Sequence, residues 1–119
     1  SRITGNILSG INYAGIAIAG SKWGTSDVVI SGNSFQNFVP ANDMITGFLV
    51  ITDTYTKSNQ YGSGLQNVII EKNTGNVADG KANEKFYTGF VALPGYMLNN
   101  IRFSNNRFSA SLAGIIKTN

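Results

Sequence analysis

The chain has 119 residues, of which 42% are hydrophobic and 13% charged, which is the length and apolar content of one folded domain with a core. It contains no Cys and no His, which excludes disulfides, thiol catalysis, imidazole metal ligands and a Ser-His-Asp triad. The net charge is +3, but the nine basic residues are scattered and no nucleic-acid module is recognisable, so we expect no nucleic-acid partner.

The apolar runs are only a few residues long, far short of the ~20 needed to cross a bilayer, so we expect no membrane insertion. The chain begins with Ser1 instead of Met and carries nothing that resembles a signal peptide. We therefore expect a processed product or an excised piece of a longer chain.

Two kinds of short strand alternate along the sequence. The first is an apolar strand with period-two alternation that ends in Asn, and the second is an apolar strand with Gly at its start. In chain order the predicted strands are residues 1–6, 14–18, 28–33, 46–50, 68–73, 88–92, 101–106 and 113–116. No segment shows a helical period of 3.6.

This self-similarity predicts a stacked architecture, in which no single unit buries its apolar face alone. The Asn positions are 27, 40 and 33 residues apart, so we expect surface loops to absorb the differences in length. Equivalent strands stacked at ~4.8 Å form parallel sheets.

Alternation also predicts which side chains face the core. In the first kind of strand the inward positions are Ile3, Val28, Ile30, Val68, Ile70, Ile101 and Phe103, and the outward positions are Arg2, Val29, Ile69 and Arg102. Just past the turn, Leu8, Phe35 and Phe108 form a second inward stack, with Gly75 at the remaining equivalent position. In the second kind, aligned on its glycines, the inward positions are Ile16, Ile18, Phe48, Val50, Phe90, Ala92 and Ile115.

The terminal asparagines of the four copies are expected to share one structural role. Asn suits a sharp corner because it tolerates the left-handed backbone conformation. Stacked side chains are also able to exchange hydrogen bonds along the column. The predicted structural column consists of Asn6, Asn33, Asn73 and Asn106.

These motifs resemble the right-handed parallel β-helix of the pectin lyase-like superfamily, whose coils carry an apolar-x-apolar-x-x-Asn strand and turn followed by a Gly-apolar strand. The resemblance covers nearly all of residues 1–119, as one domain or segment of about four coils. That superfamily includes pectate lyases, polygalacturonases, alginate epimerases, bacteriophage tailspikes and adhesin shafts. The irregular coil lengths look most like a bacteriophage tailspike segment. Asp27, next to a strand start, is a position where such a resemblance suggests a calcium ligand or a catalytic carboxylate, although no Asp-Asp pair accompanies it.

Four coils are few for this fold, and neither end carries an evident capping helix. Open ends expose unpaired strand edges and core. We expect a fragment, or a segment that is stable only within a larger or oligomeric assembly.

Two long insertions at one corner, residues 36–45 and 76–87, are expected to lie side by side. They carry the candidate catalytic carboxylates Asp43, Asp79 and Glu84. Paired carboxylates about 5 to 9 Å apart are able to hydrolyse a glycosidic bond. The alternative interpretation is that these are solvated loop charges.

Aromatic side chains present flat apolar faces that suit sugar rings. The candidate carbohydrate-binding residues are Trp23, Tyr55, Tyr61 and Tyr87. The alternative is that these rings only pack within the fold.

The second kind of strand is apolar on both faces. Its predicted outward row, Ala17, Leu49, Val91 and Ile116, carries no charge. Because a contiguous apolar strip usually marks a protein contact, we expect it to be buried against a partner subunit or against the chain's own loops.

The sequence therefore predicts a β-helical segment of a tailspike or adhesin-like protein that recognises bacterial surface polysaccharide, on a virion tail or outside the cell. The expected partners are the polysaccharide and either two further copies in a homotrimer or the remainder of a longer chain. No metal or cofactor is expected. The alternatives are a polysaccharide hydrolase or lyase that uses loop carboxylates, and a purely structural β-helical stem.

Overall fold

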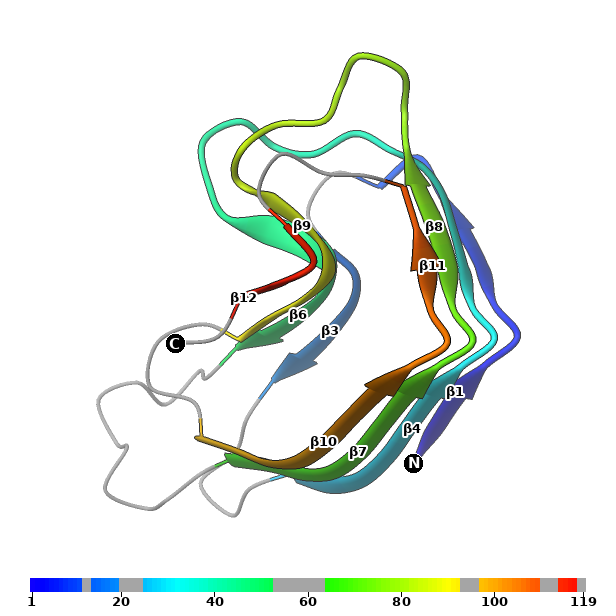
Figure 1. The fold of residues 1–119 in the computed structure, drawn as a ribbon, viewed down its shortest axis with the longest axis vertical. Coiled ribbons are helices and arrows are strands. Elements are labelled where there is room, and N and C mark those ends of the chain that lie inside the picture. The colour runs from blue at the N-terminus through cyan, green and yellow to red at the C-terminus, as the bar shows by residue number, and fades with distance from the viewer. Residues whose placement is uncertain (12–13, 20–24, 53–63, 93–96, 110–113, 118–119) are drawn as a thin grey trace.

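The structure, a computed structural model, describes residues 1–11, 14–19, 25–52, 64–92, 97–109 and 114–117. The secondary structure of these residues consists of strands, with no helix among them. The strands pair in parallel into three four-stranded sheets, an arrangement consistent with a parallel β-helix or solenoid (Figure 1). The predicted all-β fold of stacked parallel strands is confirmed.

The sheets follow one another around the chain. The first sheet has the order β1-β4-β7-β10, with β1 at Arg2–Thr4, β4 at Thr25–Ser31, β7 at Gly64–Glu71 and β10 at Met97–Ser104. The second has the order β11-β8-β5-β2, with β2 at Ile7–Ser9, β5 at Ser34–Phe38, β8 at Thr74–Val77 and β11 at Arg107–Phe108. The third has the order β12-β9-β6-β3, with β3 at Ala14–Ala19, β6 at Thr46–Thr52, β9 at Phe86–Ala92 and β12 at Ile116–Lys117.

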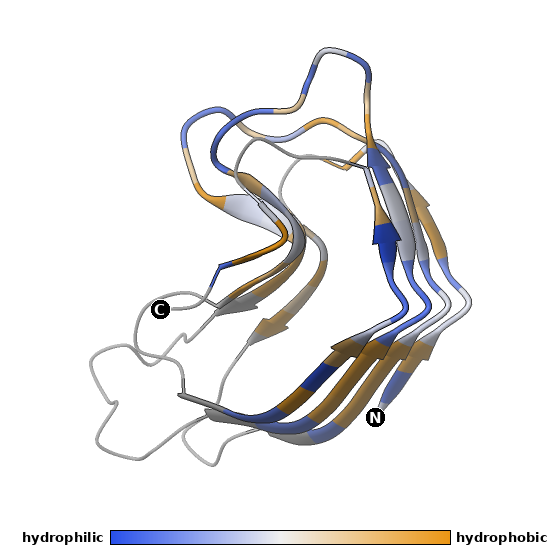
Figure 2. Cartoon of the chain, in the orientation of Figure 1, coloured by the Kyte–Doolittle hydropathy of each residue, from blue (hydrophilic) through white to orange (hydrophobic). Residues whose placement is uncertain are grey.

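The predicted facing of the first two sheets is confirmed. Ile30 pairs with Ile3 on one side and Ile70 on the other, and the core cluster contains Ile30 and Ile70 together with Val28 and Val68. In the second sheet Phe35 pairs with Leu8 and with Gly75, as expected. Figure 2 shows hydrophobic stretches, interrupted by hydrophilic positions, along the strands of the first sheet, and mostly hydrophilic colour in the loop that precedes β9.

The corner between the first and second sheets turns at a different residue from the one expected. The left-handed residue is the one before each column asparagine, namely Gly5, Gly32, Lys72 and Asn105, with φ between 55° and 67°. The column asparagine that follows does not adopt that conformation. Its side chain instead bonds to the neighbouring coils.

The register of the third sheet differs from the glycine alignment. Ile16 pairs with Leu49 and Leu49 pairs with Phe90, so Leu49 lies in the core and is only 2% exposed. The pairing of β6 with β9 also shifts by one residue after Gly47. Because successive side chains alternate between faces, a one-residue shift reverses the assignment of all those that follow.

An aromatic stack fills the centre of the molecule. The ring of Phe48 stacks between the rings of Phe35 and Phe108, at centroid distances of 5.2 and 5.1 Å. It occupies the space beside Gly75, where an added Cβ would come within 2.7 Å of the Phe48 ring. Gly75 thus interrupts the column of Phe35 and Phe108 because another ring enters at its level.

Candidate functional site: an outer groove of the first sheet

A column of polar residues marks a kink in three adjacent strands of the first sheet. Asp27, Asn67 and Asn100 are all left-handed, with φ of 59°, 55° and 56°. The pairs that flank them in β4, β7 and β10 place the three side by side. Asp and Asn tolerate this conformation better than other non-glycine residues, which explains why they occupy these three positions.

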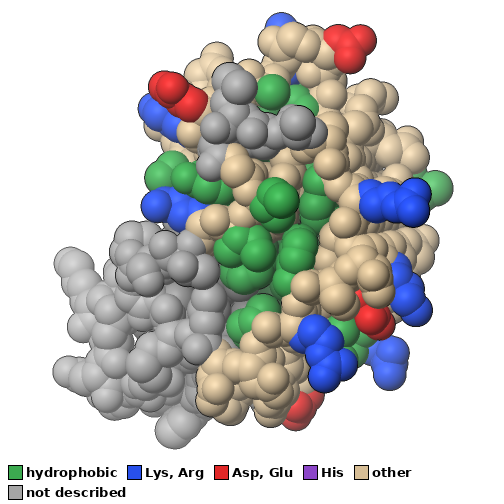
Figure 3. All heavy atoms as spheres, in the orientation of Figure 1, with side chains coloured by type: hydrophobic (Ala, Val, Ile, Leu, Met, Phe, Trp, Pro, Cys, Tyr) green, Lys and Arg blue, Asp and Glu red, His purple; other side chains and the backbone are tan. Residues whose placement is uncertain are grey.

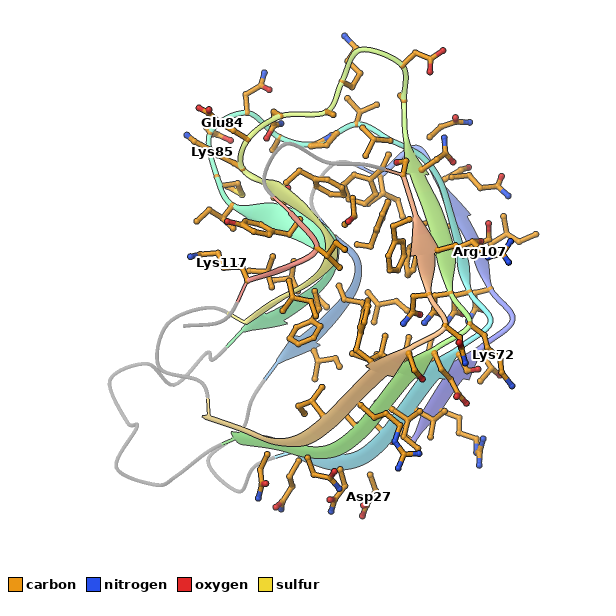
Figure 4. The ribbon with its side chains drawn as sticks, viewed as in Figure 1. Asp27, Lys72, Glu84, Lys85, Arg107 and Lys117 are labelled. Atoms are coloured by element: carbon orange, nitrogen blue, oxygen red, sulfur yellow. The ribbon has the colours of Figure 1, made fainter. Side chains whose placement is uncertain are left out.

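The side chains of this column are exposed on the outer face. Asn100 Nδ2 donates a hydrogen bond of 2.9 Å to Asn67 Oδ1. Asp27 points outward from the molecule in Figure 4. Each side chain therefore keeps polar atoms available to a ligand.

An apolar row that ends in a cation lies beside the column. Val29 pairs with Ile69, and Ile69 pairs with Arg102, so these three side chains stand in line across β4, β7 and β10. Val29 and Ile69 are half-buried and Arg102 is exposed.

The column and the row together form an outer groove of about 310 Å³. We call this the outer groove. Its lining consists of Asp27, Val29, Asn67, Val68, Ile69, Asn100 and Arg102.

The groove combines three kinds of contact. Amide groups donate and accept hydrogen bonds, a carboxylate accepts them, and a guanidinium pairs with carboxylates in a bidentate manner. Flat apolar surface lies between these polar groups. This mixture suits a ligand rich in hydroxyl groups that carries some negative charge.

The three candidate carboxylates lie elsewhere. The two insertions do contact each other, since Asn83 Nδ2 donates to Ala41 O at 3.2 Å. Asp43, Asp79 and Glu84 are all exposed on these loops, and none of them lines the outer groove. Figure 4 shows Glu84 and Asp27 on opposite sides of the molecule.

Of the candidate aromatic residues, only Tyr87 can be placed. It is half-buried in β9 and lies about 3.8 Å from where a Cβ would stand at Gly114. Trp23, Tyr55 and Tyr61 lie outside the described residues.

The predicted outward apolar row is wrong in two of its four members, because Leu49 and Ile116 both stand in the column of Ile16 and Phe90. Ala17 pairs with Val50, and Val50 pairs with Val91, whereas Leu49 stands in the inward column between Ile16 and Phe90. Leu49 belongs to the core cluster, whereas Val50 and Val91 lie outside that cluster and are still 0% exposed, so the chain itself covers them. The expectation was wrong because it aligned the strands on their glycines, whereas β6 and β12 are each offset by one residue from β3 and β9 in that alignment.

The asparagine column is a continuous hydrogen-bond ladder. Asn33 Oδ1 accepts from the backbone N–H and the Nδ2 of Asn6, both at 3.0 Å. Asn73 Oδ1 accepts likewise from Asn33, and Asn106 Oδ1 from Asn73. Asn33 and Asn73 are 1% and 0% exposed, so these two side chains serve the fold and not a ligand.

Sequence reasoning missed most of the outer groove. The resemblance to the β-helix superfamily points to Asp27 alone, and the sequence pattern did not predict that Asn67 and Asn100 lie beside it. A signal was present, since Asp or Asn stands directly before three copies of the first strand, at Val28, Val68 and Ile101.

Other classes of site find no support in the part of the chain that the structure describes. No three or more Asp and Glu side chains gather there as a metal-binding group. Those residues also form no helix with the length and apolar character to cross a membrane. Comparison of the chain with protein-family models, with curated proteins and with solved structures finds no significant match.

Proposed function

We propose that this chain binds an acidic polysaccharide in the outer groove, as a segment of a right-handed parallel β-helix like those of bacteriophage tailspikes. The observation that carries the proposal is the exposed column of Asp27, Asn67 and Asn100 beside the row that ends in Arg102. Hydroxyl groups of sugars match the amides, and a sugar carboxylate matches the guanidinium.

The coil count and the hand of the helix belong to the same proposal. Each sheet takes one strand from each copy of the repeat, which supports four coils. Crossover connections between parallel strands are right-handed in about 98% of cases, which favours a right-handed helix. The pectin lyase-like superfamily has this architecture.

Binding is favoured over cleavage by the composition of the groove. Hydrolysis of a glycosidic bond uses two carboxyl groups that face the same bond. Asp27 is the one carboxylate among the groove's lining residues. If the ligand is a surface polysaccharide, the protein is located on a virion tail or outside the cell. We do not propose a homotrimer, because the chain itself already covers Val50 and Val91 of the outer row.

Titration with polysaccharides tests the proposal. Alginate and polygalacturonate serve as acidic probes and dextran as a neutral one, with affinity measured by calorimetry at about physiological salt. We expect Arg102→Ala to weaken binding of the acidic probes about tenfold, because it removes a charge-assisted contact. The double variant Asn67→Ala/Asn100→Ala is expected to weaken binding as well.

Lys81→Ala is the matched control, since Lys81 is an exposed cation on a loop away from the groove. It should bind like the unmodified chain, and equal urea midpoints would show that all variants are folded. Failure of the unmodified chain to bind either acidic probe would overturn the proposal. An equal loss in Lys81→Ala and Arg102→Ala would also overturn it, because that result indicates nonspecific attraction to a basic protein.

A further inference from the structure

A second groove lies on the outer face of the second sheet. It has a volume of about 440 Å³ and crosses β5, β8 and β11. One row of its lining residues runs across these strands, since Ser34 pairs with Thr74 and Thr74 pairs with Arg107. Thr74 and Arg107 are exposed, and Ser34 is half-buried. We call this the second-sheet groove.

The second-sheet groove is positively charged. Arg107 is the one charged residue among the described residues that line it. Figure 4 shows Arg107 beside β11 and the exposed Lys72 at the corner before β8. The carboxylate of Glu71 belongs to the outer row of the first sheet, between Ser31 and Ser104, and does not line this groove. In Figure 3, Lys and Arg side chains lie along the edge of the molecule that the first two sheets form.

Hydrogen bonds within this groove occupy its acceptor atoms. Ser34 Oγ accepts from Gln36 Nε2 at 3.1 Å, and Ser109 Oγ accepts from a backbone N–H of β8 at 3.1 Å. Asn76 Oδ1 accepts from the backbone N–H of Asn37 at 3.3 Å. In return, Asn37 Oδ1 accepts from Asn76 Nδ2 at 3.3 Å. Four side-chain oxygens of the groove are therefore already engaged.

The groups that remain for a ligand are mainly donors. A hydroxyl that accepts one bond still carries its proton, and a side-chain amide has two N–H bonds for one oxygen. The Ser34 and Ser109 hydroxyls and the Arg107 guanidinium can all donate outward. Such a surface suits groups whose oxygens only accept. Sulfate and phosphate groups have this property, and they offer more acceptor oxygens, in a tetrahedral arrangement, than a planar carboxylate does.

The aromatic residues of the groove favour a sugar chain over a nucleic acid. Proteins that bind single-stranded nucleic acid stack its bases on exposed rings. Here the rings of Phe35 and Phe108 stack on Phe48 in the core. Hydroxyl and amide groups line the groove instead, and these form hydrogen bonds with sugar hydroxyls.

We propose that the second-sheet groove binds sulfate or phosphate groups that are carried on a sugar chain. The Arg107 guanidinium pairs with the anionic group. Thr74 and Ser34 follow at strand intervals of ~4.8 Å and donate to the same group or to neighbouring sugar hydroxyls. The site is distinct from the outer groove, where the carboxylate of Asp27 repels dense negative charge. It therefore does not rest on the function proposed for the outer groove.

Calorimetric titration with dextran sulfate and phosphorylated dextran tests the proposal at about physiological salt. Uncharged dextran and alginate serve as comparison probes. We expect at least one of the two charged dextrans to bind more tightly than uncharged dextran, and the one that binds identifies the anionic group. Arg107→Ala should weaken this binding about tenfold and leave alginate binding unchanged, because it removes a charge-assisted contact from this groove alone. Arg102→Ala should have the opposite pattern.

Thr74→Val tests the row beside Arg107. It exchanges a hydroxyl for a methyl group and should weaken binding of the charged dextran about threefold, because one hydrogen bond is lost. Lys81→Ala is the matched control, since Lys81 is an exposed cation that does not line this groove, and it should bind normally. Equal urea midpoints would show that all variants are folded.

Four outcomes would overturn the proposal. In the first, neither charged dextran binds. In the second, Lys81→Ala loses as much affinity as Arg107→Ala, which indicates nonspecific attraction to a basic protein. In the third, Arg102→Ala loses as much, which places the ligand in the outer groove. In the fourth, poly(dT) binds as tightly as the charged dextrans. If alginate fails to bind while a charged dextran binds through Arg107, the outer-groove proposal fails and this one stands.

Discussion

The four ladder asparagines have the same turn geometry but different surroundings. Asn73 is fully buried, and its Nδ2 donates to Ile30 O and to Asn106 Oδ1 while its Oδ1 accepts two bonds from Asn33. Asn6 is exposed at the end of the ladder. The same residue type thus makes contributions of very different size to the stability of the fold.

Asn73→Ala should lower the free energy of unfolding by on the order of 3 kcal/mol. The substitution leaves the backbone N–H of Asn33 and the carbonyl of Ile30 buried without these partners, and each such group costs about 1 to 3 kcal/mol. Asn6→Ala is the control and should cost less than about 1 kcal/mol, because water replaces the lost bonds. Urea unfolding of the two variants measures the difference, and equal losses would contradict a role for burial.

An irregularity in the third sheet accommodates the Phe48 side chain. The pairing of β6 and β9 shifts between Gly47 and Leu49, which leaves two residues of β9 opposite Phe48. The ring of Phe48 reaches across the core to the second sheet, where Gly75 leaves room for it. The register shift in the third sheet is therefore matched by the absence of a side chain at Gly75 in the second sheet.

Gly75→Ala should destabilise the chain by about 1 to 3 kcal/mol, because its methyl group would meet the rings of Phe48 and Phe108. Adding Phe48→Leu should make the combined loss smaller than the sum of the single losses, as expected for residues in direct contact. A double-mutant cycle from urea unfolding measures this coupling. Thr74→Ala, on the exposed face of the same strand, is the control and should be nearly neutral.

At the scale of the whole molecule, stability is concentrated in the middle coils. The largest fully buried side chains, among them Phe35, Phe48 and Ile70, belong to strands that have a neighbour on both sides. The six end strands, β1, β2, β3, β10, β11 and β12, have a neighbour on one side only.

Hydrogen exchange should reveal this gradient. In dilute protein, the amides of β4, β7, β6 and β9 should exchange on the order of a hundredfold more slowly than those of β1, β2, β11 and β12, because the ends fray before the core opens. Mass spectrometry of peptic peptides measures the difference in exchange rate. Uniform protection in dilute protein would contradict the gradient.

The repeats themselves determined much of the fold. A period of two within each strand, together with Asn at a constant position, was sufficient to predict parallel stacking, the inward positions of Ile30 and Ile70 and the column of asparagines. These features depend on local pattern, and equivalent residues of equivalent units meet whenever the units stack.

Only the tertiary structure decided the register in which the strands of the third sheet pair. That register is what places Leu49 in the core. It also decided that Asp27, Asn67 and Asn100 lie in line beside Arg102 to form a groove. The physical reason is the same in both cases. Alternation along one strand is a local property, but a side chain's neighbours depend on the pairing between strands, where a shift of one residue exchanges the inner and outer faces.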